Sequence, residues 1–164
     1  MHIPKQIISG GQTGVDRGAL QAARELGISV GGWCPPNREA EDGKIPLEFD
    51  LKESPYERSN AASHVARSLR TEWNVRDADA TLILMPTSHL IDSGTKWTID
   101  CCTAMNKPYL ICDPYEKESK FNIQNWLKEH RPAILNVAGP SESNAPGIQG
   151  AVNALLKNLF SLKM

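Results

Sequence analysis

Two glycine-containing loops carry the residues best suited to chemistry. The first loop reads Gly10-Gly11-Gln12-Thr13-Gly14 and leads directly into Asp16 and Arg17. Its glycines let backbone N–H groups turn outward and let a ligand come close, and a helix starting behind it would add partial positive charge. Thr13 can add a hydroxyl donor. The loop therefore predicts an anion site, against the alternative of a tight turn that holds no ligand.

A second loop, from Asp92 to Thr98, has similar chemistry. Gly94 permits close approach, and Ser93 and Thr95 can cap a helix whose N-terminus again favours an anion. Lys96 could supply a positive charge, and Thr98 lies one helical turn further along. Because capping alone would explain Ser93 and Thr95, their role in binding depends on the first loop.

The motifs that are missing narrow the choice of anion. No Gly-Lys-Ser/Thr follows the first glycines, which disfavours a P-loop NTP site. Ser9 stands at the first glycine of the dinucleotide fingerprint, and no acidic residue ends the second expected strand, which disfavours NAD. The four histidines and four cysteines have no metal-ligand spacing, so we expect no metal site.

Other side chains could also contribute to a site. Asp16 either complements a helix dipole or binds a ligand hydroxyl, an amine or a metal, and Arg17 either reaches a phosphate or faces solvent. If the surrounding segment folds over the crevice, Glu41 and Asp42 are the carboxylates available for acid–base work. Trp33 could stack on a purine or pterin ring. Three arginines are possible phosphate clamps: Arg38, Arg58 and Arg70.

Strand and helix patterns alternate along the whole chain. Buried-strand patterns cover 5–9, 28–33, 80–85, 108–112 and 133–137, and helical patterns cover 15–26, 60–73, 95–106, 121–130 and 149–162. The alternation predicts an α/β, Rossmann-like, doubly wound fold with about five mainly parallel strands and helices on both faces. We expect one domain, 1–164, in which 34–60 forms a long loop excursion near the site.

The positions of the glycine loops add a geometric expectation. Each follows a predicted strand, so both lie at carboxyl ends, where ligands bind in parallel sheets. If the strands at 5–9 and 80–85 are neighbours, the two loops face each other across one crevice.

Charge and hydropathy exclude several classes of protein. Eighteen Lys and Arg against nineteen Asp and Glu leave no basic surplus, so we expect no nucleic-acid partner. No apolar run approaches the ~20 residues of a membrane helix. The N-terminal residues lack a signal-peptide apolar region, and the cysteines form no disulfide pattern, so we expect a cytoplasmic location.

Several motifs together resemble the putative molybdenum carrier family and cover nearly the whole chain in order. They are Gly10–Arg17, Gly31-Gly32-Trp33-Cys34-Pro35, Ala40-Glu41-Asp42-Gly43, Arg70-Thr71, Asn74-Val75, Ala80-Thr81-Leu82-Ile83, Gly94-Thr95 with Thr98, and Leu135–Pro140. That family is similar in fold to the algal molybdenum cofactor carrier protein and to the lysine-decarboxylase-like phosphoribohydrolases. The resemblance implies a nucleotide- or pterin-phosphate-binding domain, with a molybdopterin-type cofactor as ligand and a homodimer or homotetramer as assembly.

One departure separates a carrier from an enzyme. The phosphoribohydrolases have a catalytic glutamate in their second glycine motif, where this chain has Thr98. Threonine cannot act as the carboxylate that stabilises an oxocarbenium-like centre or activates water. We therefore expect a cofactor carrier or a binding protein for a phosphorylated pterin or nucleotide, without catalysis by that mechanism.

In this reading Gly11, Gln12, Thr13 and Gly14 hold one phosphate, and Ser93, Gly94 and Thr95 hold the same anion or a second one. An alternative is an enzyme that processes a nucleotide or ADP-ribose derivative with Glu41 and Asp42. A third is an interaction module with a vestigial pocket.

Overall fold

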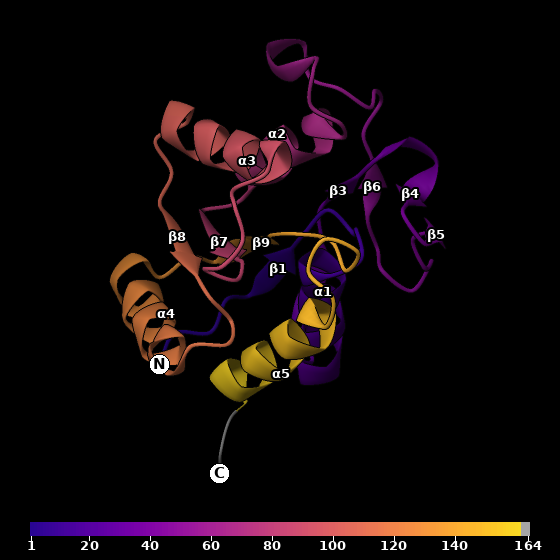
Figure 1. The fold of residues 1–164 in the computed structure, drawn as a ribbon. Helices are drawn as coiled ribbons and strands as arrows, with labels where there is room; N and C mark the ends of the chain where they lie inside the picture. Colours follow the sequence, from indigo (N-terminus) through magenta and orange to yellow (C-terminus); the bar gives the residue numbers. More distant parts are fainter. Residues whose placement is uncertain (162–164) are drawn as a thin grey trace.

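A five-stranded parallel sheet forms the centre of the molecule (Figure 1). The computed structural model describes residues 1–161. The strands lie in the order β2 (Ser29–Gly31), β1 (Gln6–Ile8), β9 (Ile134–Ala138), β7 (Ala80–Leu84) and β8 (Tyr109–Cys112). Every pairing between neighbours is parallel. The predicted Rossmann-like α/β fold is therefore confirmed.

Helices cover both faces of this sheet. In Figure 1, α2 (Ser68–Asp77) and α3 (Ser93–Ala104) lie together on one side, whereas α4 (Lys117–His130) and α5 (Ile148–Phe160) lie on the other. α1 (Val15–Leu26) packs along α5. The larger core joins α1, α4 and α5 to the sheet, and a smaller apolar cluster lies between α2 and α3. No helix among residues 1–161 is long and apolar enough to cross a membrane.

The order of the strands corrects one expectation. β1 and β7 are not neighbours, because β9 lies between them. The carboxyl ends of all three strands nevertheless share one edge of the sheet, since every pairing is parallel. The loops after β1, β9 and β7 therefore all reach that edge.

Two predicted elements are interrupted. The helix expected at 60–73 begins only at Ser68, after a short 3₁₀ turn at Asn60–Ala62 and a left-handed Arg67 (φ 58°). The strand expected at 28–33 breaks at Gly32, whose φ of 120° suits glycine and where a Cβ would lie 2.6 Å from Ser9 O. The other elements shift by a few residues at their ends, and the predicted end of the last helix at 162 lies outside the described residues.

The excursion at 34–60 is a folded wall with its own small core. It contains a 3₁₀ turn (Pro36–Arg38), the parallel pair β3 (Trp33–Cys34) with β6 (Lys52–Glu53), and the hairpin β4 (Glu39–Ala40) with β5 (Gly43–Lys44). Its apolar side chains pack on α1. The Arg38 guanidinium donates to four carbonyls of the segment, at Ile45, Pro46, Phe49 and Leu51. Arg38 thus stabilises the segment and is not a phosphate clamp.

Candidate functional site

A cavity of about 350 Å³ lies at the carboxyl ends of β1, β9 and β7. This is where parallel α/β sheets bind ligands, and the volume falls within the range of small-molecule sites. Its lining comes from five parts of the chain: the first loop and α1 (Gln12, Asp16), the excursion (Glu41), the approach to α2 and its first turn (Val65, Ala66, Arg67, Arg70, Thr71), the start of α3 (Asp92–Thr95, Thr98), and the end of β9 with the segment after it (138–141, 143, 144). A larger, more open groove beside α1 and α5 contains none of the predicted site residues.

The N-terminus of α3 brings free donors to this cavity. Asp92 is the N-cap, since its side chain accepts from Thr95 N at 2.7 Å, so the expectation that Ser93 or Thr95 caps the helix is wrong. The N–H groups of Ser93 and Gly94 donate to no protein group within residues 1–161. Thr98 donates its hydroxyl to Gly94 O at 3.0 Å. Two open amides at a helix N-terminus are suited to an anion.

A buried ion pair lies at the same cavity. Arg70 Nη1 stands 3.3 Å from Asp16 Oδ2, which also accepts from Gln12 N at 3.3 Å. Burial raises the pKa of Asp16, an effect that the Arg70 guanidinium opposes. Arg70 Nε is buried and has no hydrogen-bond partner among the described residues. An unpaired buried donor is costly, so an acceptor from a ligand would stabilise it.

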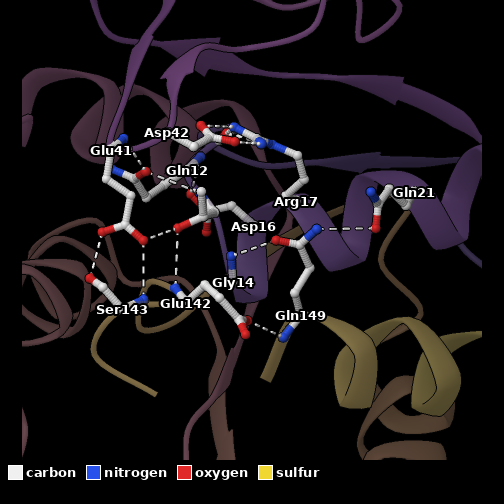
Figure 2. A network of polar contacts seen from close by, with 12 residues as sticks. Gln12, Gly14, Asp16, Arg17, Gln21, Glu41, Asp42, Glu142, Ser143 and Gln149 are labelled. Carbon is white, nitrogen blue, oxygen red and sulfur yellow. Dashed lines mark hydrogen bonds and ion pairs between the residues drawn. The ribbon is translucent and has the colours of Figure 1, made fainter. Parts of the chain in front are cut away.

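The backbone donors of the first glycine loop from Gln12 onward already bind protein oxygens, as Figure 2 shows in part. Thr13 N donates to Gln12 Oε1 at 3.0 Å, and Gly14 N donates to Gln149 Oε1 at 3.0 Å. Val15 N donates to Pro140 O at 3.2 Å. The loop is also tightly covered, because a Cβ on Gly14 would lie 2.5 Å from Pro140 O. Protein groups therefore occupy three of the four amides that the sequence assigns to a phosphate, those of Gln12, Thr13 and Gly14.

Glu41 places its carboxylate against this loop (Figure 2). It accepts hydrogen bonds from the Thr13 hydroxyl, from Ser143 N at 3.1 Å and from Ser143 Oγ at 2.6 Å. Desolvation raises the pKa of Glu41, but the hydrogen bonds from Ser143 and Thr13 outweigh it and leave the pKa below its ordinary value. Glu41 is thus held as an anion at the edge of the cavity.

Asp42 and Arg17 bind each other outside the cavity. Two hydrogen bonds of 2.6 and 3.1 Å join the guanidinium to the carboxylate, and Arg17 also donates to Gly11 O. Hydrogen bonding from Arg17 lowers the pKa of Asp42. Arg17 therefore anchors the excursion to the first loop instead of reaching into the cavity.

Two further candidates lie elsewhere. Trp33 packs against Trp73 and donates its indole N–H to Asp77 at 2.7 Å, in a separate hollow beside β2. Lys96 is exposed and pairs with Asp100 at 2.9 Å. Neither lines the cavity.

The structure thus gathers some predicted residues and separates others. Those that line the cavity are Gln12, Asp16, Glu41, Arg70, Ser93, Gly94, Thr95 and Thr98. Those that do not are Gly10, Gly11, Thr13, Gly14, Arg17, Trp33, Asp42 and Lys96. The backbone of Gly10 makes room for Arg70, since a Cβ there would lie 2.1 Å from Arg70 Nη1.

Sequence reasoning assigned no binding role to Arg67, Thr71 or Asp92, which also line the cavity. Arg67 stands three residues before Arg70, a spacing that would place both on one helix face. Asp92 precedes Ser93-Gly94-Thr95 at a position favoured for helix caps. Thr71 belongs to the Arg70-Thr71 motif, although nothing local gives its side chain a role.

Comparison with known proteins agrees with this architecture. The model of the "Circularly permutated YpsA SLOG family" matches residues 7–160. A crystal structure of a putative molybdenum carrier protein from Syntrophus aciditrophicus SB is similar, with 34% identity, coverage of 98% of this chain and 97% of that chain, and a TM-score of 0.87. No curated protein matches the chain. Both similarities extend over every segment that lines the cavity.

Proposed function

The chain belongs to the circularly permutated YpsA SLOG family, and on that premise we propose that it binds and carries a small phosphorylated ligand. The Syntrophus protein is named a putative molybdenum carrier, so a molybdopterin-type cofactor is the first candidate for the cargo. A phosphorylated nucleotide is the second. The proposed site is the cavity between the N-terminus of α3 and the first glycine loop.

The observation that carries this proposal is the donor set at one end of the cavity. The N–H groups of Ser93 and Gly94 are open, and the guanidinium of Arg70 has a buried Nε without a partner among the described residues. The oxygens of a phosphate can accept hydrogen bonds from both kinds of donor, the backbone amides and the guanidinium. The cavity volume of about 350 Å³ is suited to a mononucleotide or pterin phosphate more than to a dinucleotide.

The states of the nearby side chains favour binding over hydrolysis. Thr98 stands where the phosphoribohydrolases have a glutamate, and its hydroxyl donates to Gly94 O. Asp42 is paired with Arg17, and Glu41 is held ionised by three donors. A general acid or base works best with a pKa near the operating pH, which neither carboxylate has.

Asp16 supports the second candidate, an enzyme that processes a nucleotide or ADP-ribose derivative. It is buried at the cavity, and its pKa is raised by desolvation, as is common for catalytic carboxylates. In that case Asp16, more than Glu41 or Asp42, would carry the acid–base step. Turnover of AMP or ADP-ribose that disappears in Asp16→Asn would favour the enzyme.

For assembly, the resemblance supports a homodimer or homotetramer, and the four free cysteines favour a location in the cytoplasm. Leu90 and Ile91, just before the N-terminus of α3, are exposed by 94% and 52%. Adjacent exposed apolar side chains are typical of an interaction surface. Light scattering of the purified chain tests the assembly.

The binding proposal is tested by native mass spectrometry of the anaerobically purified protein, followed by calorimetric titration with AMP as a defined phosphate ester. We expect Arg70→Gln to weaken AMP binding by about tenfold or more, the loss typical of a charge-assisted hydrogen bond. Arg76→Gln is the matched control, because Arg76 lies on the same helix but is exposed and pairs with Asp77. Equal affinity in Arg70→Gln and the wild type would contradict the proposed site.

A further inference from the structure

The carboxylate of Glu41 lies in a set of donors that resembles an anion-binding site. The Thr13 hydroxyl comes from the loop after β1, whereas the amide and hydroxyl of Ser143 come from the segment after β9. Glu142 N also donates to Thr13 Oγ1 at 3.1 Å, which orients the hydroxyl of Thr13 toward Glu41. An amide and two hydroxyls that converge on one carboxylate would serve equally for an oxygen of a phosphate.

We propose that Thr13 and Ser143 form a second anion position at the edge of the cavity and that Glu41 fills it, so that the ligand carries one anionic group instead of two. This inference rests on the proposed function, because it takes the first anionic group to lie at the N-terminus of α3. Glu41 thereby selects a phosphate monoester over a ligand with a second anionic group at its other end.

The charges around the cavity support this selection. Three carboxylates line it (Asp16, Glu41 and Asp92), against the two guanidinium groups of Arg67 and Arg70. Both arginines and the open amides belong to the α2 and α3 wall, whereas Glu41 lies on the opposite loops. A second anion near Glu41 would meet a like charge within a few ångströms, where repulsion is strong.

The carboxylate of Glu41 can be removed by mutation without unfolding the segment that carries it. Glu41 N donates to Gln12 Oε1 at 2.9 Å, and the next residue, Asp42, is bound to Arg17. These contacts hold the backbone independently of the Glu41 side chain. Removing the carboxylate should therefore open the Thr13–Ser143 position and leave the wall in place.

The test is a titration of the ¹⁵N-labelled protein with inorganic phosphate, followed by amide chemical shifts. In the wild type we expect saturable shifts at Ser93 and Gly94 and none at Ser143. In Glu41→Gln and Glu41→Ala we expect a second saturable shift at Ser143, with half-saturation roughly tenfold or more below the highest phosphate concentration that leaves Ser143 unshifted in the wild type. Adding Thr13→Val to Glu41→Gln should remove much of that gain.

Glu48→Gln is the matched control, because it removes the same charge from the same segment at an exposed pair with Arg24. It should behave as the wild type. The inference is overturned if Ser143 responds in the wild type at the same phosphate concentration as in the Glu41 variants, or if it responds in none of them. A response at Ser143 in the variants without any at Gly94 would instead retain the second position and overturn the proposed site at α3.

Discussion

The two glycine loops differ in what their backbone amides bind. In the first loop, the N–H groups of Thr13, Gly14 and Val15 donate to protein oxygens at 3.0, 3.0 and 3.2 Å. In the second loop, the N–H groups of Ser93 and Gly94 have no protein acceptor within residues 1–161. Similar local sequence therefore produces one loop whose amides from Gln12 to Val15 are bound to protein oxygens and one whose helix N-terminus is open to a ligand.

The difference arises from residues far away in the chain. Gln149 reaches Gly14 from α5, and the segment from Pro140 to Glu142 covers the first loop. Within residues 1–161 no such segment covers Gly94, where an added Cβ would meet only Asp92 Oδ1, at 3.5 Å. A glycine-rich loop at the end of a strand thus becomes an anion site only if the rest of the fold leaves its amides free.

The largest expected effect is a difference in stability when a methyl group is added to one glycine of each loop. Gly14 has φ 83° and would place a Cβ 2.5 Å from Pro140 O, so Gly14→Ala should lower the free energy of unfolding by about 3 kcal/mol or more. Gly94 lies in the first turn of α3, where an added Cβ would make only an ordinary contact with Asp92. Gly94→Ala should therefore change the free energy of unfolding by less than about 0.5 kcal/mol. Urea unfolding of both variants gives the comparison. Equal losses would show that the two loops are packed alike.

A smaller effect should separate the two arginine–aspartate pairs. Arg17→Gln removes the contacts to Asp42 and Gly11 O, so we expect a loss of about 1–3 kcal/mol in stability with AMP affinity unchanged. Arg70→Gln should differ by lowering affinity as well as stability, because Arg70 lines the cavity and also pairs with the buried Asp16. Thermal unfolding and calorimetry on the same samples measure both quantities. A tenfold loss of AMP affinity in Arg17→Gln would show instead that the first loop takes part in binding.

The smallest effect is a difference in the titration of two aspartates. Desolvation raises the pKa of Asp16 above its usual 3.8, whereas the Arg17 hydrogen bond lowers that of Asp42 below 3.8. Asp42 therefore contributes stability above pH 4 that is lost as the pH falls through its lowered pKa. Asp16 has the opposite sign, since its ionisation disfavours the folded state as the pH rises through its raised pKa. Carboxyl ¹³C shifts measure both midpoints, and the reverse order would contradict this assignment.

Much of the fold could be predicted from the sequence because its signals are local. The apolar run of β7 and the Gly27 stop of α1 depend only on nearby residues. The strand order could not be predicted, since nothing local indicates that β9 inserts between β1 and β7. The break in the helix before Ser68 could not be predicted either, because it depends on a contact between residues nine positions apart. Ser59 and Ser68 hydrogen-bond to each other and hold the non-helical segment between them.

The site was predicted in part. The spacing of Gly94, Thr95 and Thr98 identified the loop that lines the cavity, and the motif around Arg70 identified its guanidinium. The prediction could not tell that Gln149 and Glu41 satisfy the first loop, because both arrive through tertiary contacts. Trp33 is predicted near the site by its position at the end of a strand, but the strand breaks at Gly32 and Trp33 packs against Trp73.

The most direct test of the central claim is a crystal structure of the protein with bound AMP. The account predicts the phosphate within hydrogen-bond distance of the N–H groups of Ser93 and Gly94 and of the Arg70 guanidinium. The first-loop amides should remain bonded to Gln12 and Gln149. A phosphate held by the amides of Gly11 to Gly14, with Gln149 displaced, would contradict it.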